Sequence, residues 1–512
     1  MADALPPPAA VLSDDPVVLQ GMIRELLSVL ASERRNREQL EQRLDQLLRH
    51  LYGPRSEKRA AGPTLFDDCA APVAKMPLPP PPEVVTSPTP PKQNGHGRRK
   101  LPADLPRQRV EHDLSEVEKV CPCCASARVK IGEEISERLD YTPSQLQVIE
   151  HVRPKYLCRK CQGEVAIAPL PPEPIVKAMA APGLLAHVIV SKFADHLPLY
   201  RQEKIFARSG LELPRSTLCD WLAGCAELLQ PLYALMVKLV LQSKVIHTDD
   251  TPVRLLQPEG PKTGRVWVYL GDAAHPYTVY EATTNRSRDG PMTFLRDFKR
   301  YLQADAFGGY DGVYARGVTE VACWAHARRK FVEAERTEPA RAAEAIARIR
   351  SLYTVEEKAR SLSAPERAAL RQAEAAPRLE SFRQWFDQVQ KEVLPKSPLG
   401  QALTYVRKQW AALNVYVTDG DLAIDNNAAE RALRGTAVGR KNWLFFGSET
   451  GGQTAAVLTT FIATCQRHGL NPWLYLKDVL TRLPACPEAE LPNLLPDAWA
   501  KAQHAPVEPA KP

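Results

Sequence analysis

A proline-rich stretch near the N-terminus limits most strongly how this chain can fold. Nine of the twenty residues from Pro72 to Pro91 are proline. Proline fixes φ near about −65° and lacks a backbone N–H donor, so neither a helix nor a central strand runs through such a stretch. We therefore predict a semi-rigid linker over residues 71–100, with separately folded parts on either side.

The segment before the linker, residues 17–52, predicts one long helix. Apolar residues recur in steps of three and four, with a polar interruption at Glu33 and Arg37, which is a heptad pattern. At about 1.5 Å per residue this helix would be about 54 Å long, too long for a small domain to cover. We predict a coiled coil through which the chain forms a homo-oligomer. The alternative is an amphipathic helix packed on its own domain.

The length and composition predict a multidomain protein of the cytosol. A chain of 512 residues with 44% hydrophobic residues suggests three or four units and at least one sizeable core. The formal net charge of +7 fits a nucleic-acid partner without requiring one. The N-terminus lacks the pattern of a secretory signal, and no apolar run approaches the roughly 20 residues that span a bilayer. No membrane partner is expected.

Cysteine spacing predicts a metal site. Eleven cysteines in a reducing compartment favour metal binding or burial over disulfides. Two C-x-x-C pairs stand at Cys121, Cys124, Cys158 and Cys161. Four thiolates hold Zn²⁺ tetrahedrally in structural sites, so we predict a zinc-binding β domain over residues 101–170. Four buried thiols are the alternative, and Cys123 could substitute as a ligand.

Residues 171–240 read as helical. Helices are predicted at Leu199–Arg208 and from Pro214 to Leu229, joined by Ser209-Gly210. Two short helices joined by a glycine turn fit a DNA-binding helix-turn-helix. An ordinary helical hairpin fits equally well.

Strand patterns begin at Lys244. We predict three sequential strands, a helix and two more strands, at Val245–Leu256, Arg265–Asp272, Tyr277–Thr283, Pro291–Arg300, Tyr301–Asp305 and Val318–Trp324. This is the order of a ribonuclease-H-like domain, which we place at residues 241–455 with a helical insertion at about 331–410. A helical region and tail follow over residues 456–512. The predicted fold class is multidomain α/β.

Three carboxylates are candidates for a catalytic metal site: Asp249, Asp305 and Glu430. Phosphoryl transfer on DNA by two metal ions needs hard oxygen ligands, which carboxylates supply. Three carboxylates crowded together repel one another unless a cation neutralises them. Spacing alone makes this weak evidence, and by itself it favours a surface ion pair between Glu430 and Arg434 over a metal ligand.

Cations and an aromatic residue follow Glu430 closely, at Arg431, Arg434, Arg440, Lys441 and Trp443. We predict that these residues contact the DNA backbone and that Trp443 stacks on a displaced base. The alternative is a solvated face beside a core tryptophan. Cys323 and His326 could form a second metal knuckle, an active-site edge or a packed strand end.

Several motifs, taken in order, carry a resemblance to a known family. They are LYGPRSEK at Leu51–Lys58, LPADLPRQRVEHDL at Leu101–Leu114, CPCC at Cys121–Cys124, HVRPKYLCRKC at His151–Cys161, DDTP at Asp249–Pro252, GRVWVY at Gly264–Tyr269, LQADAFGGYDGVY at Leu302–Tyr314, CWAHARRKF at Cys323–Phe331 and IDNNAAERALRGTAVGRKNWLFFGSETGG at Ile424–Gly452. Over nearly its whole length the chain resembles transposases of the insertion-sequence-66 family.

The resemblance implies a ribonuclease-H-like DDE core behind a zinc-binding domain, with Asp249, Asp305 and Glu430 as ligands of Mg²⁺ or Mn²⁺. It implies strand cleavage by metal-activated water, then attack of the freed 3′ hydroxyl on target DNA. It also implies small companion proteins of the same element and a bacterial, nucleoid-associated location. Two positions depart from the family pattern. Asp250 replaces the usual Glu and becomes a rival ligand, and Gly435 replaces the usual Pro, which could loosen the helix end.

Two other functions remain open from the sequence. A ribonuclease-H-like nuclease would cut DNA without joining it. A DNA-binding protein with a decayed active site would do neither, although the presence of all three carboxylates argues against decay.

Overall fold

The computed structural model describes residues 101, 105, 107–142, 145–160 and 164–504, together with isolated positions between 20 and 37. Those isolated positions are helical and exposed. The rest of the predicted coiled coil and the whole linker lie outside the described residues. The chain forms two compact units, one containing Trp324–Gly420 and the other built from His96–Cys323 and Asp421–Pro512.

The cysteine-bearing part of the second unit is a small sheet. Its strands are β1 (Arg107–Glu111), β2 (Val129–Thr142), β3 (Gln145–Leu157) and β4 (Ala166–Ile167). They lie in the order β1-β3-β2, with β4 also on β3, and the long β2–β3 pair is antiparallel. Leu139 lies opposite Val148 in this pair, and both are fully buried. They join the core of the helices that follow, which anchors one end of the ribbon.

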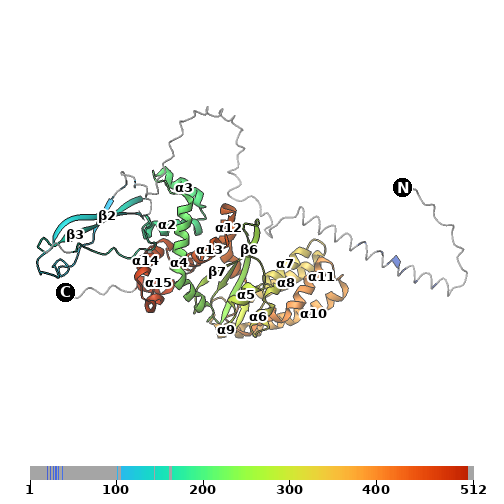
Figure 1. Ribbon diagram of the computed structural model, residues 1–512. Coiled ribbons are helices and arrows are strands. Elements are labelled where there is room, and N and C mark those ends of the chain that lie inside the picture. Colours follow the sequence, from blue (N-terminus) through green and yellow to red (C-terminus); the bar gives the residue numbers. More distant parts are fainter. Residues whose placement is uncertain are drawn as a thin grey trace, which may run out of the picture. The chain divides into compact units, whose positions relative to one another are not determined.

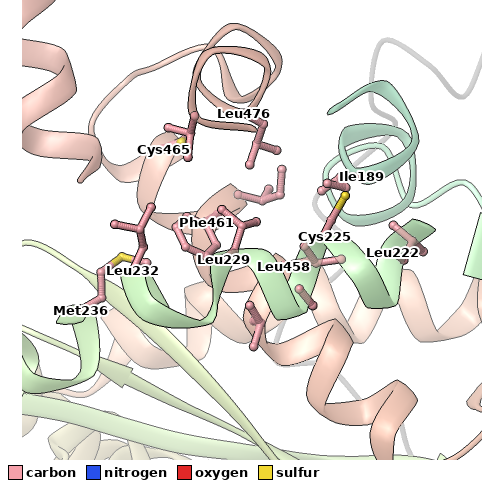
Figure 2. Packing of buried hydrophobic residues seen from close by; sticks show 14 of the residues in the cluster. Ile189, Leu222, Cys225, Leu229, Leu232, Met236, Leu458, Phe461, Cys465 and Leu476 are labelled. Carbon is pink, nitrogen blue, oxygen red and sulfur yellow. The ribbon is translucent and has the colours of Figure 1, made fainter. Parts of the chain in front are cut away.

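The core of this unit is helical. Its helices are α2 (Pro182–Phe193), α3 (Leu199–Arg208), α4 (Arg215–Val240), α13 (Glu449–Arg467), α14 (Pro472–Arg482) and α15 (Pro496–His504). Figure 2 shows Leu229 and Leu232 of α4 packed beside Phe461 of α13. Gly210 ends α3 with φ of +77°, a left-handed conformation that glycine adopts without steric cost. α3 and α4 are thus separate helices around a glycine turn, as predicted, although α4 runs on to Val240.

Helix α4 is long and apolar enough to cross a bilayer, judged by length and composition alone. This differs from the prediction of no apolar run of that length. Nine of its residues are buried, among them Leu218, Leu229 and Met236, which belong to the core shared with α2, α13 and α14. A helix at the centre of a packed core has this same composition.

A second sheet follows α4 in the chain (Figure 1). Its strands are β5 (Val245–Leu255), β6 (Lys262–Leu270), β7 (Thr278–Thr283), β8 (Tyr301–Gln303), β9 (Thr319–Val321) and β10 (Phe445–Phe446). The order is β7-β6-β5-β8-β9, with β10 on the far end of β5. β5, β6 and β7 are antiparallel neighbours, whereas β5, β8 and β9 run parallel. The sheet is therefore mixed, with β5 at its centre.

Both faces of this sheet are covered. On one face Trp267 and Tyr269 are fully buried, and Tyr269 stacks on Phe294 of α5 (Asp289–Phe294). That helix is shorter than the predicted Pro291–Arg300, since the chain leaves the helix at Leu295, which is itself buried. α6 (Asp311–Tyr314) follows β8. On the other face lie α13 and α12 (Asn427–Trp443), with Leu433 of α12 in the core.

The first unit is helical and interrupts the second in sequence, between β9 and α12. Its helices are α7 (Trp324–Ala334), α8 (Pro339–Lys358), α9 (Ala364–Leu370), a π-helical turn (Arg371–Ala375), α10 (Ala376–Glu392) and α11 (Pro398–Asn414). Helical structure starts at Trp324, earlier than the predicted Phe331. Trp324 is fully buried and its Nε1 donates to the carbonyl of Leu413, so the residues after Cys323 begin a packed helix.

Candidate functional site

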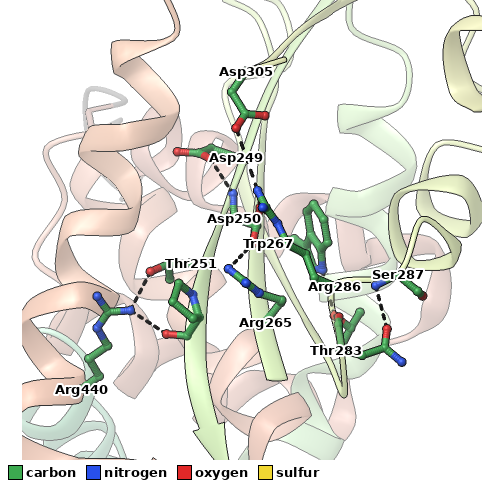
Figure 3. A network of polar contacts seen from close by, with 12 residues as sticks. Asp249, Asp250, Thr251, Arg265, Trp267, Thr283, Arg286, Ser287, Asp305 and Arg440 are labelled. Carbon is green, nitrogen blue, oxygen red and sulfur yellow. Dashed lines mark hydrogen bonds and ion pairs between the residues drawn. The ribbon is translucent and has the colours of Figure 1, made fainter. Parts of the chain in front are cut away.

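Strand register brings Asp249 and Asp305 side by side. β5 runs parallel to β8, and His247 of β5 lies opposite Gln303 of β8. Asp249 and Asp305 each lie two residues after this pair, so they are level with one another. Figure 3 shows the two carboxylates near one another. The Oδ1 atom of Asp305 accepts a hydrogen bond from the Phe307 amide at 3.2 Å, which fixes this carboxylate at the strand end.

Glu430 comes from the first turn of α12, and the turn before this helix is fastened to the sheet. Gln303 donates from Nε2 to the carbonyl of Asp425 at 3.1 Å. Asn426 is fully buried and donates from Nδ2 to the carbonyl of Thr248 at 2.8 Å. Both anchors lie on the strands that carry or precede the aspartates. They therefore fix the start of α12 against the sheet, and Glu430 is close enough to Asp249 for its charge to contribute to the raised pKa of Asp249.

The pKa of Asp249 is affected by its burial and by several neighbouring carboxylates. Burial raises the pKa of Asp249 to about 7, the negative charges of Asp305, Asp250 and Glu430 add to the rise, and a hydrogen bond from the Asp250 amide opposes it. In the described part of the chain, the oxygens of these carboxylates do not all come within 4.8 Å of one another. A divalent cation between them would offset the repulsion of these like charges.

Asp250 lies on the opposite face of β5 from Asp249, because side chains alternate along a strand. Its carboxylate is only 2% exposed and accepts from two arginines (Figure 3). Arg265 donates from Nη1 at 3.0 Å, and Arg286 donates from Nε at 3.0 Å and from Nη2 at 2.8 Å. The Arg286 guanidinium also lies 3.9 Å from the ring centre of Phe307. Asp250 is thus held by cations.

The cations of α12 divide into two kinds. Arg431, Arg434 and Lys441 are exposed. Arg440 instead points back to the sheet, where its Nη1 donates to the Thr251 hydroxyl at 2.9 Å and to the Pro252 carbonyl at 2.6 Å (Figure 3). Arg440 therefore ties the second half of α12 to the strand that carries Asp249.

Trp443, at the end of α12, is half-buried. Its ring is stacked on that of Phe446, with centroids 4.9 Å apart and planes 10° from parallel. One face of the indole is thereby covered by Phe446.

The cysteines form a second cluster. The sulfur atoms of Cys121, Cys124 and Cys158 all lie within 4.8 Å of one another, and those of Cys124 and Cys158 are 3.2 Å apart. A tight turn closes the first pair: the Ala125 amide donates to the Cys121 carbonyl at 2.9 Å, and Ala125 has φ of +53°. Cys123 in this turn is exposed. The fourth predicted ligand, Cys161, lies outside the described residues.

Some supporting residues were missed from the sequence. His247 faces the Asn426 side chain at 3.1 Å, and the sulfur of Cys323 accepts from the Asn426 amide at 3.1 Å. Cys323 thus supports the turn before α12. An Asn directly before a helix is typically a cap, but the Asn426 side chain makes no cap hydrogen bond and is bonded to the sheet instead, so the sequence did not signal this role. Arg286 gave no signal either, because its partners come from distant strands.

The sequence was compared with models of known protein families. The model described as "Transposase IS66 family" matches residues 177–454, more than half of the chain. The chain belongs to the IS66 transposase family. Three further models of the same family match: "zinc-finger binding domain of transposase IS66" at 118–162, "IS66 C-terminal element" at 460–496 and "Transposase C of IS166 homeodomain" at 39–110.

Curated relatives of this IS66-family chain come from Sinorhizobium fredii. The protein named "Uncharacterized protein y4hP" is 34% identical over 435 residues, which cover 80% of this chain and 78% of that protein. "Uncharacterized protein y4jD" is 34% identical over 421 residues, which cover 79% and 82%. Family membership supports a transposase role with DNA as partner. The zinc-finger model covers all four predicted cysteine ligands, which are the three clustered cysteines and Cys161.

Proposed function

We propose that this chain is the DNA-cutting and DNA-joining subunit of an insertion sequence. The observation that carries the proposal is that Asp249 is electrostatically coupled to Asp305 and Glu430, within the region matched by the transposase family. The mixed sheet supports a ribonuclease-H-like core, since its three antiparallel strands continue into two parallel ones. The helices from Trp324 to Asn414 are then an insertion in that core.

The three carboxylates fit divalent cations. Their oxygens are the hard ligands that Mg²⁺ and Mn²⁺ prefer. Burial, and after it the negative charges of Asp305, Asp250 and Glu430, raise the pKa of Asp249, and a bound cation would favour its charged form. When bound, such ions stabilise the attacking and leaving oxygens of an in-line displacement. Asp249 and Asp305 would hold them from the sheet, and Glu430 from α12.

The reaction consists of two displacements at phosphorus. In the first, a water oxygen bonds to phosphorus and the bond to the 3′ oxygen breaks, so the strand end leaves as a 3′ hydroxyl after taking up a proton. In the second, that hydroxyl attacks a target phosphodiester and releases a new 3′ hydroxyl. We assign the exposed Arg431, Arg434 and Lys441 to the DNA backbone beside this site. Arg440 and Asp250 hold α12 and β5 in place, so Asp250 is a positioning residue rather than a rival ligand.

The remaining parts serve binding and assembly. Cys121, Cys124 and Cys158, completed by Cys161, would hold a structural Zn²⁺ that folds the module next to β2 and β3. α3 and α4 are candidates for a helix-turn-helix that contacts DNA. Residues 17–52 would form the coiled coil of a homo-oligomer and meet the companion proteins of the element. The proposed location is the bacterial cytoplasm, on the nucleoid.

The test uses DNA carrying the inverted repeats that flank the coding region. Purified full-length protein with Mg²⁺ or Mn²⁺ should nick the repeat end and join it to a plasmid target. Cleavage without joining would favour the simple nuclease. Binding without cleavage in either metal would favour a decayed, DNA-binding protein.

A further inference from the structure

A cavity of about 530 Å³ lies beside α12, within the second unit. Its floor is formed by β6 and β7, and its walls by α12, α13 and the segment that follows α2. Pockets for small organic groups typically measure roughly 300–1,000 Å³. The cavity is therefore large enough for one nucleotide.

The lining combines an aromatic pair with cations. Trp443 and Phe446, stacked on one another, form part of the wall. Lys192 and Arg431 also line it. Among the residues that the structure describes, no carboxylate pairs with Lys192, and burial lowers its pKa. Lys192 is half-buried, and a partly desolvated cation without an anionic partner is unfavourable, so this wall is suited to an anionic ligand with a flat apolar part.

Small residues on α12 keep the cavity open. Ala428, Ala432 and Gly435 line it at helical spacing. Gly435 lies in the middle of α12, which continues to Trp443, so it does not loosen a helix end as the sequence had suggested. A Cβ atom at Gly439 would lie 2.6 Å from Nε1 of Trp443, so only glycine there lets the indole fold back along the helix.

The cavity and the carboxylates lie on opposite flanks of α12. Glu430 is two residues from both Ala428 and Ala432, which is about 200° around a helix with 3.6 residues per turn. A DNA strand held at Glu430 would therefore have to cross the exposed ridge that carries Arg434 to reach the cavity. A helix is about 10–12 Å across, and nucleotides rise by about 3.4 Å per step in duplex DNA, so an unpaired strand, which can extend further, crosses it in at most about three nucleotides.

We propose that this cavity holds one unpaired nucleotide of the DNA end, about three nucleotides from the bond that is cut. The inference rests on the proposed DNA-cutting function and names a second contact that the function does not require. The base would stack on Trp443, and the adjacent phosphate would meet Lys192 and Arg431. Base–aromatic stacking tolerates any base, so the site would recognise an unpaired nucleotide of any sequence.

The experiment measures DNA binding by fluorescence anisotropy, with full-length protein and no added Mg²⁺ or Mn²⁺. The probes are a blunt duplex of mixed sequence and the same duplex with a three-nucleotide overhang, on either strand, that ends in 2-aminopurine. Wild-type protein should bind one overhang duplex roughly tenfold more tightly than the blunt duplex, because stacking adds about 1–3 kcal/mol per base. Its 2-aminopurine fluorescence should be quenched on binding.

Two variants test the cavity itself. Gly435→Leu fills it, since a Cβ there points towards His196 at 3.8 Å without a clash. This variant should lose the preference for the overhang and keep its affinity for the blunt duplex. Val438→Leu places the same leucine side chain on the exposed face of α12, where Val438 is 50% exposed, and should behave like wild type. Lys192→Gln removes a cation without filling space and should weaken the preference severalfold.

Unquenched 2-aminopurine with wild-type protein would overturn the proposal, whatever the variants do. An overhang preference that survives in Gly435→Leu would also overturn it, as would a change of oligomeric state in that variant, which would indicate that another protein occupies the cavity. Since binding is measured without catalytic cations, these outcomes stand even if no strand cleavage is ever observed.

Discussion

Arg286 donates two hydrogen bonds to one carboxylate oxygen of Asp250, the residue next to Asp249 in β5. The same guanidinium lies 3.9 Å from Oδ2 of Asp305. Arg286 is thus shared between a buried aspartate that faces away from the candidate metal site and an aspartate that belongs to it. Arg286 is bound mainly by Asp250, because both of these hydrogen bonds go to Asp250 and the contact with Asp305 is longer.

Because Arg286 is shared in this way, we expect Asp250 to influence metal binding at Asp305. Asp250→Asn removes the negative charge that holds Arg286, which can then pair with Asp305 and compete with a divalent cation. We expect cleavage to need about tenfold more Mg²⁺ for half-maximal rate. Asp250→Glu keeps the charge and is the matched control, with near wild-type metal dependence. Equal Mg²⁺ titrations for Asp250→Asn and wild type would show that Arg286 does not act through Asp305.

The three carboxylates should be separable from DNA binding. We expect Asp249→Asn, Asp305→Asn and Glu430→Gln each to bind repeat DNA normally and to lose at least about a hundredfold in cleavage rate, because a two-metal site needs every ligand. Asp297→Asn changes an exposed carboxylate away from this site and should cut normally. A Glu430→Gln protein that cuts at the wild-type rate would remove α12 from the catalytic site.

The cysteine cluster should carry about one Zn²⁺ per full-length chain, as measured by elemental analysis. Cys158→Ser removes a clustered sulfur and should lose the metal and unfold the module, since binding at such sites contributes roughly 10 kcal/mol of folding energy. Cys123→Ser is the matched control, because Cys123 is exposed and turned out of the cluster. Metal loss from the control instead would move the ligand assignment to Cys123.

Salt dependence should distinguish the cations of α12. Each phosphate contact contributes roughly 0.9 to the slope of log K against log[salt] on duplex DNA. We expect Arg434→Ala/Lys441→Ala to bind repeat DNA more weakly with a slope shallower by about 1.8. Arg440→Ala removes a contact to Thr251 and Pro252 and should lower thermal stability instead. An unchanged slope in the double variant would place both side chains away from DNA.

Glu281 on β7 should make stability depend on pH. Burial raises the pKa of Glu281 to about 7, so the folded chain keeps a proton that the unfolded chain loses above about 4.5. The stability from this proton is present at pH 4.5 and is lost as the pH rises through 7. Glu281→Gln stays neutral, so we expect it to exceed wild type at pH 8 by on the order of 2 kcal/mol. Urea unfolding at pH 5 should show a much smaller difference; an equal gain at both values would exclude this titration.

The sequence predicted those features that follow from local patterns. β5 begins at Val245 and β7 ends at Thr283 as expected, and α3 spans Leu199–Arg208, because alternation and helical periodicity reflect burial on one face. The family motifs placed the three carboxylates in order. That Asp249 and Asp305 lie side by side depends on the parallel register of β5 and β8, which no local pattern specifies.

Features that depend on distant partners were beyond the sequence. The inward turn of Arg440 needs the Thr251 hydroxyl, 189 residues away in the chain. The pairing of Asp250 depends on Arg265 and Arg286, and a lone Asp beside a candidate ligand looks like a ligand itself. The cavity beside Trp443 lies where α12, α13 and the end of α2 meet. The sequence alone therefore could not predict that the small residues of α12 line a cavity.

The order of the elements along the chain has a consequence for synthesis. Asp249 and Asp305 leave the ribosome first, and the whole of Trp324–Gly420 follows before α12 brings Glu430. A chain cut short anywhere in that stretch would carry two of the three carboxylates and lack the helix, with its exposed cations, that completes the site. If the chain has the proposed activity, incomplete copies made in the cell could not cut DNA, and cutting would become possible only after α12 has been synthesised.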